Sequence, residues 1–586
     1  MIKVFSRLKP REWLMICISL VFIVAQVWLD LRIPDYMAEV TRIVSAPSGA
    51  IGDVVDVGIM MLLCALGSAV TSVVIGYFAA KVGASFSHGL RGDVFRRVES
   101  FSMEELNAFS TASLITRTTN DVTQVQMLIA MGLQVVIRAP IMAVWALVKM
   151  SAGDWEWTAL TGGLVAIVVI MISALMTYSL PRFRKIQTLT DSLNLVTREN
   201  LTGIRVVRAY NAEGFQQQKF KQANDDFTSN SLSVHRAMQV MNPVMRLVLT
   251  VLSLGIFWIG AFLINAANMD DRIGIFANMV VFSQYAVHVI MAFMMLTMVL
   301  IMLPRVMVSV KRINEVLDTT PRIIDGNISQ PTEGIIGEVE FRNVSFKYPD
   351  AEDYVLFNIS FKAKRGETVA LIGSTGSGKS TVVNLVPRFY DVSEGQVLVD
   401  GVDVRDYTQE ALRNKLGYVP QRATLFSGTV SSNVAFGSNG KPEVALSEIK
   451  TAVSVAQAAP FVEKMEDGYN ACIAQGGTNV SGGEKQRLAI ARAVCRKPEI
   501  YIFDDSFSAL DYRTDRELRN ALKRETAGTT SLIVAQRIGT IRDADRIIVL
   551  SEGKLVGDGT HDELLSTCEV YKEIAYSQLS AEELGL

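Results

Sequence analysis

Six long apolar segments in the first half of the chain constrain its fold more than any other feature. Each has about 20 residues or more, the length that a helix needs to cross roughly 30 Å of hydrocarbon. The first is not a signal peptide, because no small-residue cleavage site follows it and residues 30–34 continue it. We therefore expect six membrane-spanning helices. They fall at residues 13–31, 58–80, 128–148, 158–178, 244–264 and 275–303.

Basic residues are unevenly distributed among the connections and predict the orientation of the chain. The positive-inside rule assigns the connections rich in lysine and arginine to the cytoplasm. Both termini are therefore predicted to be cytoplasmic. The other connections carry mainly Arg42 and Arg272. The basic clusters are Lys3, Arg7, Lys9 and Arg11, then Arg91, Arg96, Arg97 and Arg117, then Arg182, Arg184, Lys185, Arg198, Arg205 and Arg208.

Both cytoplasmic connections are long and are compatible with helix almost throughout. A disordered loop of about 45 residues would be unusual inside a compact protein. We expect the membrane helices to continue into the cytoplasm, at 1.5 Å per residue, and to turn back there. The two tips, residues 102–121 and 200–220, are predicted to form short helices that dock on another domain.

Two arginines, Arg138 and Arg246, lie within or at the edge of apolar segments. Ionisable groups at such positions are costly and usually face a bundle interior or an aqueous cavity. A role in the substrate pathway and a structural ion pair are equally open. The sixth segment is rich in methionine, which suits promiscuous apolar sites but also ordinary helix packing and lipid contact. These methionines are Met279, Met291, Met294, Met295, Met298 and Met302.

The composition changes near residue 320, where the apolar segments end and an ordinary soluble mixture begins. A chain of 586 residues is too long for one core, so several domains are expected. The formal net charge of −2 argues against nucleic acid as a partner. The cysteines show neither metal spacing nor a disulfide framework. They are Cys17, Cys64, Cys472, Cys495 and Cys568.

A phosphate-binding loop follows an apolar strand at residues 368–372. It matches the pattern G-x-x-x-x-G-K-[ST] in the required strand–loop–helix context. Backbone N–H groups of such a loop wrap the phosphates, and the helix N-terminus adds positive potential. Lys379 would reach the β- and γ-phosphates of ATP, and Ser380 would bind Mg²⁺. The predicted loop is Gly373, Ser374, Thr375, Gly376, Ser377, Gly378, Lys379 and Ser380, with Thr381 beginning the helix.

Further residues typical of a nucleotide site occur elsewhere in the second half of the chain. Asp504 ends the apolar strand at residues 500–503, and its carboxylate suits the Mg²⁺ shell. The segment Val480, Ser481, Gly482, Gly483 and Glu484 resembles the LSGGQ signature of the ATP-binding cassette (ABC) superfamily, an element that simple P-loop ATPases lack. In that family Ser481 and the glycine N–H groups would contact the ATP held by the opposite subunit.

The resemblance assigns further roles. Gln421 is similar to the Q-loop residue that links Mg²⁺ to the membrane domain, Tyr348 to the aromatic residue that stacks on adenine, and residues 508–511 to the D-loop. It covers essentially the whole chain and implies an exporter-type half-transporter. The expected fold is a six-helix transmembrane bundle with long cytoplasmic helical extensions, followed by an α/β P-loop nucleotide-binding domain. The predicted domains are residues 1–318 (transmembrane, with two coupling helices), 319–335 (connector) and 336–586 (ABC).

The signature departs mildly from the family, with Val480 and Glu484 in place of leucine and glutamine, and two catalytic positions depart more strongly. Asp505 stands where the family has its general base, a glutamate, and Gln536 stands where it has its switch histidine. Asp505 is one methylene shorter, and a misplacement of about 1 Å can cost on the order of 10²-fold in rate. Gln536 can donate a hydrogen bond but carries no positive charge. This chain's own ATP site is therefore predicted to be degenerate, with a second half-transporter supplying the glutamate.

The predicted function is an ATP-driven exporter subunit in the bacterial cytoplasmic membrane that moves amphipathic drugs or lipids. The pattern around the signature and Asp505 is similar to that of bacterial heterodimeric multidrug exporters. A homodimeric exporter with slow ATPase, or a peptide or lipid transporter, is the alternative. A channel gated by ATP and an importer are further hypotheses. The sequence does not identify the transported substrate.

Overall fold

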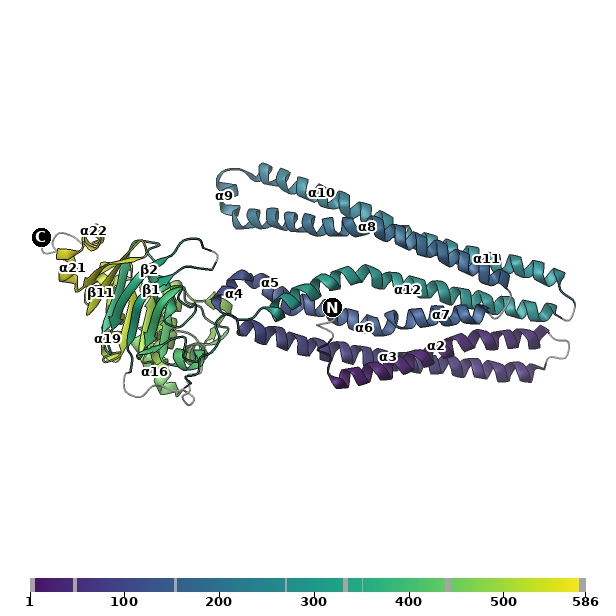
Figure 1. Cartoon of the computed structure of the whole chain (residues 1–586), viewed down its shortest axis with the longest axis horizontal. Coiled ribbons are helices and arrows are strands. Elements are labelled where there is room, and N and C mark those ends of the chain that lie inside the picture. The colour runs from purple at the N-terminus through teal and green to yellow at the C-terminus, as the bar shows by residue number, and fades with distance from the viewer. Residues whose placement is uncertain are drawn as a thin grey trace. The chain divides into compact units, whose positions relative to one another are not determined.

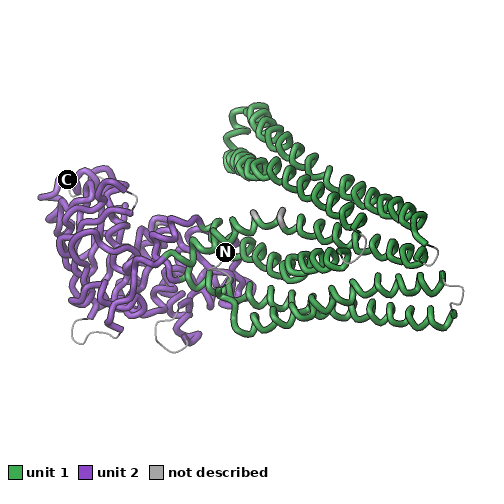
Figure 2. Tube along the Cα trace, turned by 45° about the vertical axis from the view of Figure 1, so that its right-hand side comes forward, with its two compact units in different colours: residues 1–99, 111–319 green, residues 100–110, 320–586 purple. Residues whose placement is uncertain are grey.

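The computed structural model describes residues 6–45, 50–151, 155–268, 271–329, 336–349, 351–437 and 444–578. Lys3, residues 330–335 of the predicted connector and the side chain of Met298 lie outside this description. The chain divides into two compact units (Figure 2). The first contains residues 1–99 and 111–319, and the second contains residues 100–110 and 320–586.

The first unit is entirely helical in its described part (Figure 1). Two five-residue π-helical segments, η1 and η2, interrupt the third long helix. The helices are α2 (Pro10–Ser45), α3 (Ile51–Glu99), α5 (Thr111–Thr116), η1 (Arg117–Asp121), α6 (Val122–Met131), η2 (Gly132–Val136), α7 (Arg138–Ser151), α8 (Trp155–Thr202), α9 (Ile204–Ala209), α10 (Glu213–Gln239), α11 (Met241–Ala266) and α12 (Arg272–Asp318).

Six helical stretches of this unit are long and apolar enough to cross a membrane, which confirms the six predicted segments. Several are far longer than a membrane requires. The stretch Glu213–Ala266 has 54 residues, or about 80 Å at 1.5 Å per residue. Helices α8 and α10 run side by side and are joined at their far end by α9 (Figure 1). The predicted long helical extensions are therefore present.

Interior packing and lipid exposure explain why these residues form a bundle. The core gathers apolar side chains from several helices, including Leu31, Trp157 and Ile256. The Trp157 indole Nε1 donates to the Ile256 carbonyl at 3.1 Å, so this buried polar atom has a partner. On α3 apolar side chains such as Leu63 and Val73 are exposed, as expected of a helix that faces lipid. A helix satisfies its own backbone hydrogen bonds, which a membrane demands.

The second unit is built on three sheets with helices around them. Its strands are β1 (Val339–Phe346), β2 (Leu356–Ala363), β3 (Thr368–Gly373), β4 (Glu394–Val399), β5 (Val402–Asp403), β6 (Leu416–Val419), β7 (Gly428–Thr429), β8 (Cys472–Ile473), β9 (Ile500–Asp504), β10 (Thr530–Val534), β11 (Arg546–Ser551) and β12 (Lys554–Gly559). Its α-helices are α4 (Met103–Ala108), α13 (Lys379–Leu385), α14 (Gln409–Asn414), α15 (Val430–Val434), α16 (Leu446–Val455), α17 (Ala459–Val462), α18 (Gly482–Arg496), α19 (Tyr512–Glu525), α20 (Ile538–Ile541), α21 (His561–Thr567) and α22 (Glu569–Gln578).

The largest sheet has the strand order β12-β11-β3-β10-β9-β6. All its neighbouring pairs are parallel except β11 with β12. A second, antiparallel sheet has the order β2-β1-β4-β5. Strand β9 is buried along its whole length, as near-continuous apolar strands in parallel sheets are. The predicted α/β nucleotide-binding fold is confirmed.

Candidate nucleotide site

The parallel strands of the large sheet end at one edge, and the predicted site residues follow those ends. The phosphate-binding loop follows β3, and Asp504 closes β9. Gln536 lies two residues beyond β10, and Gln421 two residues beyond β6. Because β9, β10 and β6 are neighbours in register, residues far apart in sequence meet here. Ligands of open α/β sheets bind at this carboxyl edge.

The loop between β3 and α13 has the geometry of a phosphate cradle. Ser374, Thr375 and Gly376 are exposed, whereas Ser377 and Lys379 are buried. Gly376 and Gly378 have φ angles of 83° and 94°, which favour glycine. The Lys379 Nζ donates to the carbonyls of Gly373 and Ser374 at 2.9 and 2.7 Å. The Lys379 ammonium group is thus held by carbonyl oxygens of the loop itself.

The residues beside the loop fit Mg²⁺. The Ser380 hydroxyl donates to Asp504 Oδ1 at 2.7 Å, so a hydroxyl and a carboxylate, both hard oxygen donors, already lie together. Mg²⁺ in nucleotide sites is usually bound by one or two such groups together with substrate phosphates. Burial raises the pKa of Asp504, the charge of Asp505 raises it further, and the Ser380 hydrogen bond opposes both.

Asp505 is held by two side-chain amides. The Gln536 Nε2 donates to Asp505 Oδ2 at 2.8 Å, and the Gln421 Nε2 donates to the same oxygen at 3.2 Å. The Asp505 backbone has a φ of 45°, a left-handed conformation that is uncommon outside glycine, though aspartate tolerates it. The two departures from the family pattern are therefore joined by a direct hydrogen bond.

Burial dominates the electrostatics of this edge. It raises the pKa of Asp505, while hydrogen bonds from Gln421 and Ser508 and the charge of Lys379 oppose the shift. It also lowers the pKa of Lys379, and the two carboxylates counteract that effect. The Lys379 cation and each carboxylate therefore partly offset the cost of burial for one another.

Tyr348 lies close to the loop. Its hydroxyl is 3.1 Å from Thr381 Oγ1. Its ring is partly buried and makes T-shaped contacts with the rings of Phe346 and Tyr390. The predicted adenine-stacking residue is therefore next to the phosphate-binding helix. Its contact with a base stays a prediction.

The signature segment lies at the start of α18. Ser481 caps this helix, and its hydroxyl and backbone N–H both donate to Glu484 Oε2 at 2.8 Å. Glutamate at this position therefore completes a capping box. Val480 is buried in the second core of the unit, and a Cβ on Gly483 would meet the Ala509 carbonyl at 3.4 Å. Within the described residues no hydrogen bond joins the signature to the phosphate-binding loop.

Sequence reasoning did not predict several contacts around the site. The Ser508 hydroxyl donates to the Asp505 carbonyl at 3.0 Å. Helix α4 belongs to the second unit, where Asn107 Nδ2 donates to the Tyr390 hydroxyl at 3.1 Å and Arg322 contacts Glu104 at 2.6 Å. The sequence predicted that the tip at 102–121 would dock on another domain. Residues 100–110 of this tip belong to the second compact unit, together with residues 320–586. Nothing local in the sequence identifies their partners.

The ionisable residues of the apolar segments are paired. Arg138 Nη2 lies 2.8 Å from Asp30, and Lys149 lies 2.8 Å from Asp35. Of the two alternatives left open, the structure shows the ion pair for Arg138. The Arg246 side chain is exposed and forms no hydrogen bond or ion pair with the described residues. Met279 is buried, and Met302 lines a cavity.

Comparisons with known proteins agree with this architecture. The family model of the ABC transporter transmembrane region matches residues 16–302, and that of the ABC transporter nucleotide-binding part matches residues 356–508. A Mycobacterium tuberculosis protein described as an uncharacterized ABC transporter ATP-binding protein is 41% identical over 527 residues, which are 90% of this chain and 88% of that protein. The chain therefore belongs to the ABC transporter family.

More distant relatives carry functional names. An ATP-dependent lipid A-core flippase of Pseudomonas putida is 32% identical over 511 residues, covering 87% of this chain and 83% of the flippase. A solved bacterial Atm1-family ABC exporter with ATP bound superimposes with a TM-score of 0.81 at 23% identity, covering 97% of this chain and 99% of the exporter. That likeness shows that the fold is of the exporter type.

Proposed function

We propose that this chain is one subunit of an ATP-driven exporter, and that its own ATP site binds the nucleotide but hydrolyses it slowly. The observation that carries the proposal is the environment of Asp505. Its Oδ2 accepts two amide hydrogen bonds at the position where a general base must take a proton from water. Geometry comes first for such a base, and a short side chain held by Gln536 is poorly placed to reach that water.

The rest of the site supports nucleotide binding. Lys379 and the loop at 373–380 would hold the phosphates of ATP, and Tyr348 would contact its adenine. Ser380, Gln421 and Asp504 would hold Mg²⁺, which would neutralise charge on the phosphates and supply Lewis-acid polarisation. The chain's own residues would therefore orient ATP without promoting attack on it.

A second half-transporter would complete the assembly. The residues at 480–484 keep a serine and two glycines at the start of α18, so they can contact the ATP of a partner that carries the glutamate. The tip at α9 exposes apolar side chains that would dock on a cassette. These are Leu201, Val206, Tyr210 and Phe215, with exposed fractions of 66%, 61%, 80% and 68%.

The transported substrate is proposed to be amphipathic, either a drug or a lipid. Relatives named lipid A-core flippases support a lipid-like substrate, although the name belongs to those proteins. The proposed location is the bacterial cytoplasmic membrane, with both termini and the ABC domain in the cytoplasm. The proposed domain limits stay at 1–318, 319–335 and 336–586.

The ATPase rate of an Asp505→Glu variant tests the degenerate site. We expect the variant of the full chain to hydrolyse ATP on the order of 10²-fold faster than the wild type, because the carboxylate moves by about 1 Å. Adding Gln536→His should raise the rate further. If the wild-type homodimer turns over at about 1 s⁻¹ or faster, within the usual enzyme range, the chain is instead a homodimeric exporter with two working sites.

A further inference from the structure

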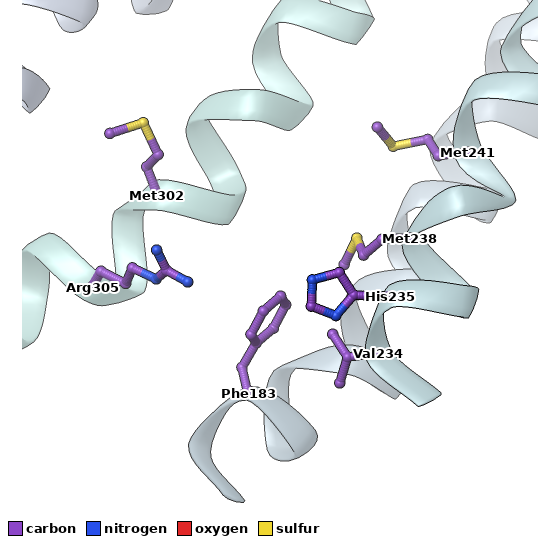
Figure 3. Close-up of a pocket in the computed structure, with 7 residues that line it drawn as sticks. All are labelled: Phe183, Val234, His235, Met238, Met241, Met302 and Arg305. Carbon is purple, nitrogen blue, oxygen red and sulfur yellow. The ribbon is translucent and has the colours of Figure 1, made fainter. Parts of the chain in front are cut away.

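An open hollow of about 310 Å³ lies in the first unit, between α8, the junction of α10 with α11, and α12 (Figure 3). Two of its lining residues, His235 and Arg305, are exposed. Volumes of about 300 Å³ and above are typical of small-molecule sites. Its position is independent of the nucleotide machinery, because every lining residue belongs to the membrane-spanning unit.

The apolar part of the lining suits apolar ligands of varied shape rather than one fixed shape. It consists of Phe183, Val234 and three methionines from three helices, Met238, Met241 and Met302. Methionine side chains are unbranched and polarisable, so they adapt to irregular apolar ligands. Figure 3 shows these side chains around the hollow.

The polar part of the lining is cationic or neutral. Arg305 and His235 are the two ionisable residues that line the cavity, and the Arg305 guanidinium points across the hollow towards Phe183 and His235 (Figure 3). Among the described residues the Arg305 side chain has no hydrogen-bond or ion-pair partner. A neighbouring hollow shares His235 and adds Arg236. Neither lining includes a described aspartate or glutamate.

The level of the cavity along the helices matches the inner edge of a membrane. Phe183 lies 28 residues beyond the start of α8 at Trp155, and Arg305 lies 33 residues beyond the start of α12 at Arg272. These separations correspond to roughly 40–50 Å of helix. A bilayer with its head groups is about 40–45 Å thick. A ligand here would place its charge at head-group depth and its apolar part among the methionines.

We propose that this cavity is a binding site for an anionic amphiphile, whose carboxylate or phosphate head pairs with Arg305 while its apolar chain lies against the methionines. The inference rests on the proposed exporter function and narrows its substrate class. An amphiphile with a cationic head would be repelled by Arg305, which has no acidic partner among the described residues. The same head-group chemistry is available from a bilayer lipid or from a free amphiphile.

Photo-crosslinking of the full-length chain in nanodiscs of zwitterionic lipid tests the site. The probes are a diazirine-bearing long-chain carboxylate and the amine of the same chain, and labelled residues are mapped by mass spectrometry. We expect the carboxylate to label residues 234–241 and Met302 about ten-fold more than the amine does, since a charge-assisted hydrogen bond is worth about one decade of affinity. Arg305→Gln should remove this preference, and Arg305→Lys should retain most of it.

Arg246→Gln is the matched control, because Arg246 is an exposed arginine of α11 that lines neither hollow. Adding anionic lipid to the nanodiscs identifies the source of the ligand. Competition between this lipid and the carboxylate probe indicates a bilayer lipid, whereas no competition indicates a free amphiphile. Equal labelling by carboxylate and amine, or wild-type labelling of Arg305→Gln, would overturn the site. Labelling is measured without ATP, so a failed Asp505→Glu experiment leaves this result standing, and the reverse also holds.

Discussion

Asp505 is the residue on which the proposed slow hydrolysis depends. Its Oδ2 accepts hydrogen bonds from Gln536 and Gln421, and its backbone is left-handed. The shorter side chain and the neutral amide at position 536 therefore act as a pair. A glutamate at 505 would have to break or remake the contact with Gln536, which is why the second substitution should add to the first.

An Asp505→Asn substitution tests the cost of this buried charge. Folding raises the pKa of Asp505, so the stability linked to its protonation is present below the unfolded value and is lost as pH rises through the folded value. The asparagine variant without nucleotide should therefore unfold roughly 2 °C higher than the wild type at about pH 7.5. Thermal unfolding of the full-length protein measures the difference.

The gain should shrink as the pH is lowered towards about 4, the ordinary value for an aspartate, because the wild-type carboxyl then binds its proton. Asp558→Asn is a suitable control, since Asp558 lies on β12 in an ion pair with Arg546 rather than among buried carboxylates. An Asp505→Asn protein that is less stable at neutral pH would show that the amide hydrogen bonds outweigh burial.

The elements of the fold differ in how far the sequence predicts them. The six membrane helices follow from local hydropathy and length, and the phosphate-binding loop from residue spacing. The hydrogen bond between Asp505 and Gln536 depends instead on β9 pairing with β10, a contact between strands far apart in sequence. The ion pair between Asp30 and Arg138 likewise joins α2 to α7. Non-local partners of this kind have no local signal.

The proposed docking of the α9 tip on a cassette can be tested by substitution. Tyr210 at its end is 80% exposed, and the proposed role of the tip is to dock on a cassette. Replacing it with aspartate would bury an unpaired charge at that contact. We expect Tyr210→Asp to lower transport and substrate-stimulated ATPase by about ten-fold while nucleotide binding is unchanged.

Transport into inverted vesicles and binding of a fluorescent ATP analogue separate these two effects. Tyr576→Asp is the control, because Tyr576 is an exposed tyrosine of α22 with no proposed docking role. Normal transport by the Tyr210→Asp protein would remove α9 from the coupling pathway.

At the scale of the whole molecule, we expect the nucleotide-binding unit and both ends of the chain to lie in the cytoplasm. Cysteine labelling in a background without the native cysteines tests this orientation. A cysteine at Ile51, 85% exposed at the start of α3, should react with an impermeant maleimide in intact cells. A cysteine at Gly214, where a side chain would meet no atom within 4 Å, should react only after permeabilisation. The opposite pattern would invert the topology.

The central claim is that this chain's own site holds ATP and cleaves it slowly, and retention of the γ-phosphate tests it most directly. The purified transporter, with whatever half-transporter accompanies this chain, is incubated with Mg²⁺ and photoreactive ATP labelled at the γ-phosphate, and is then crosslinked at successive times. The account predicts that label on this chain persists long after a partner with a catalytic glutamate has lost its own. Loss of the γ-label from this chain as fast as from the partner, or as fast as from an Asp505→Glu version, would contradict it.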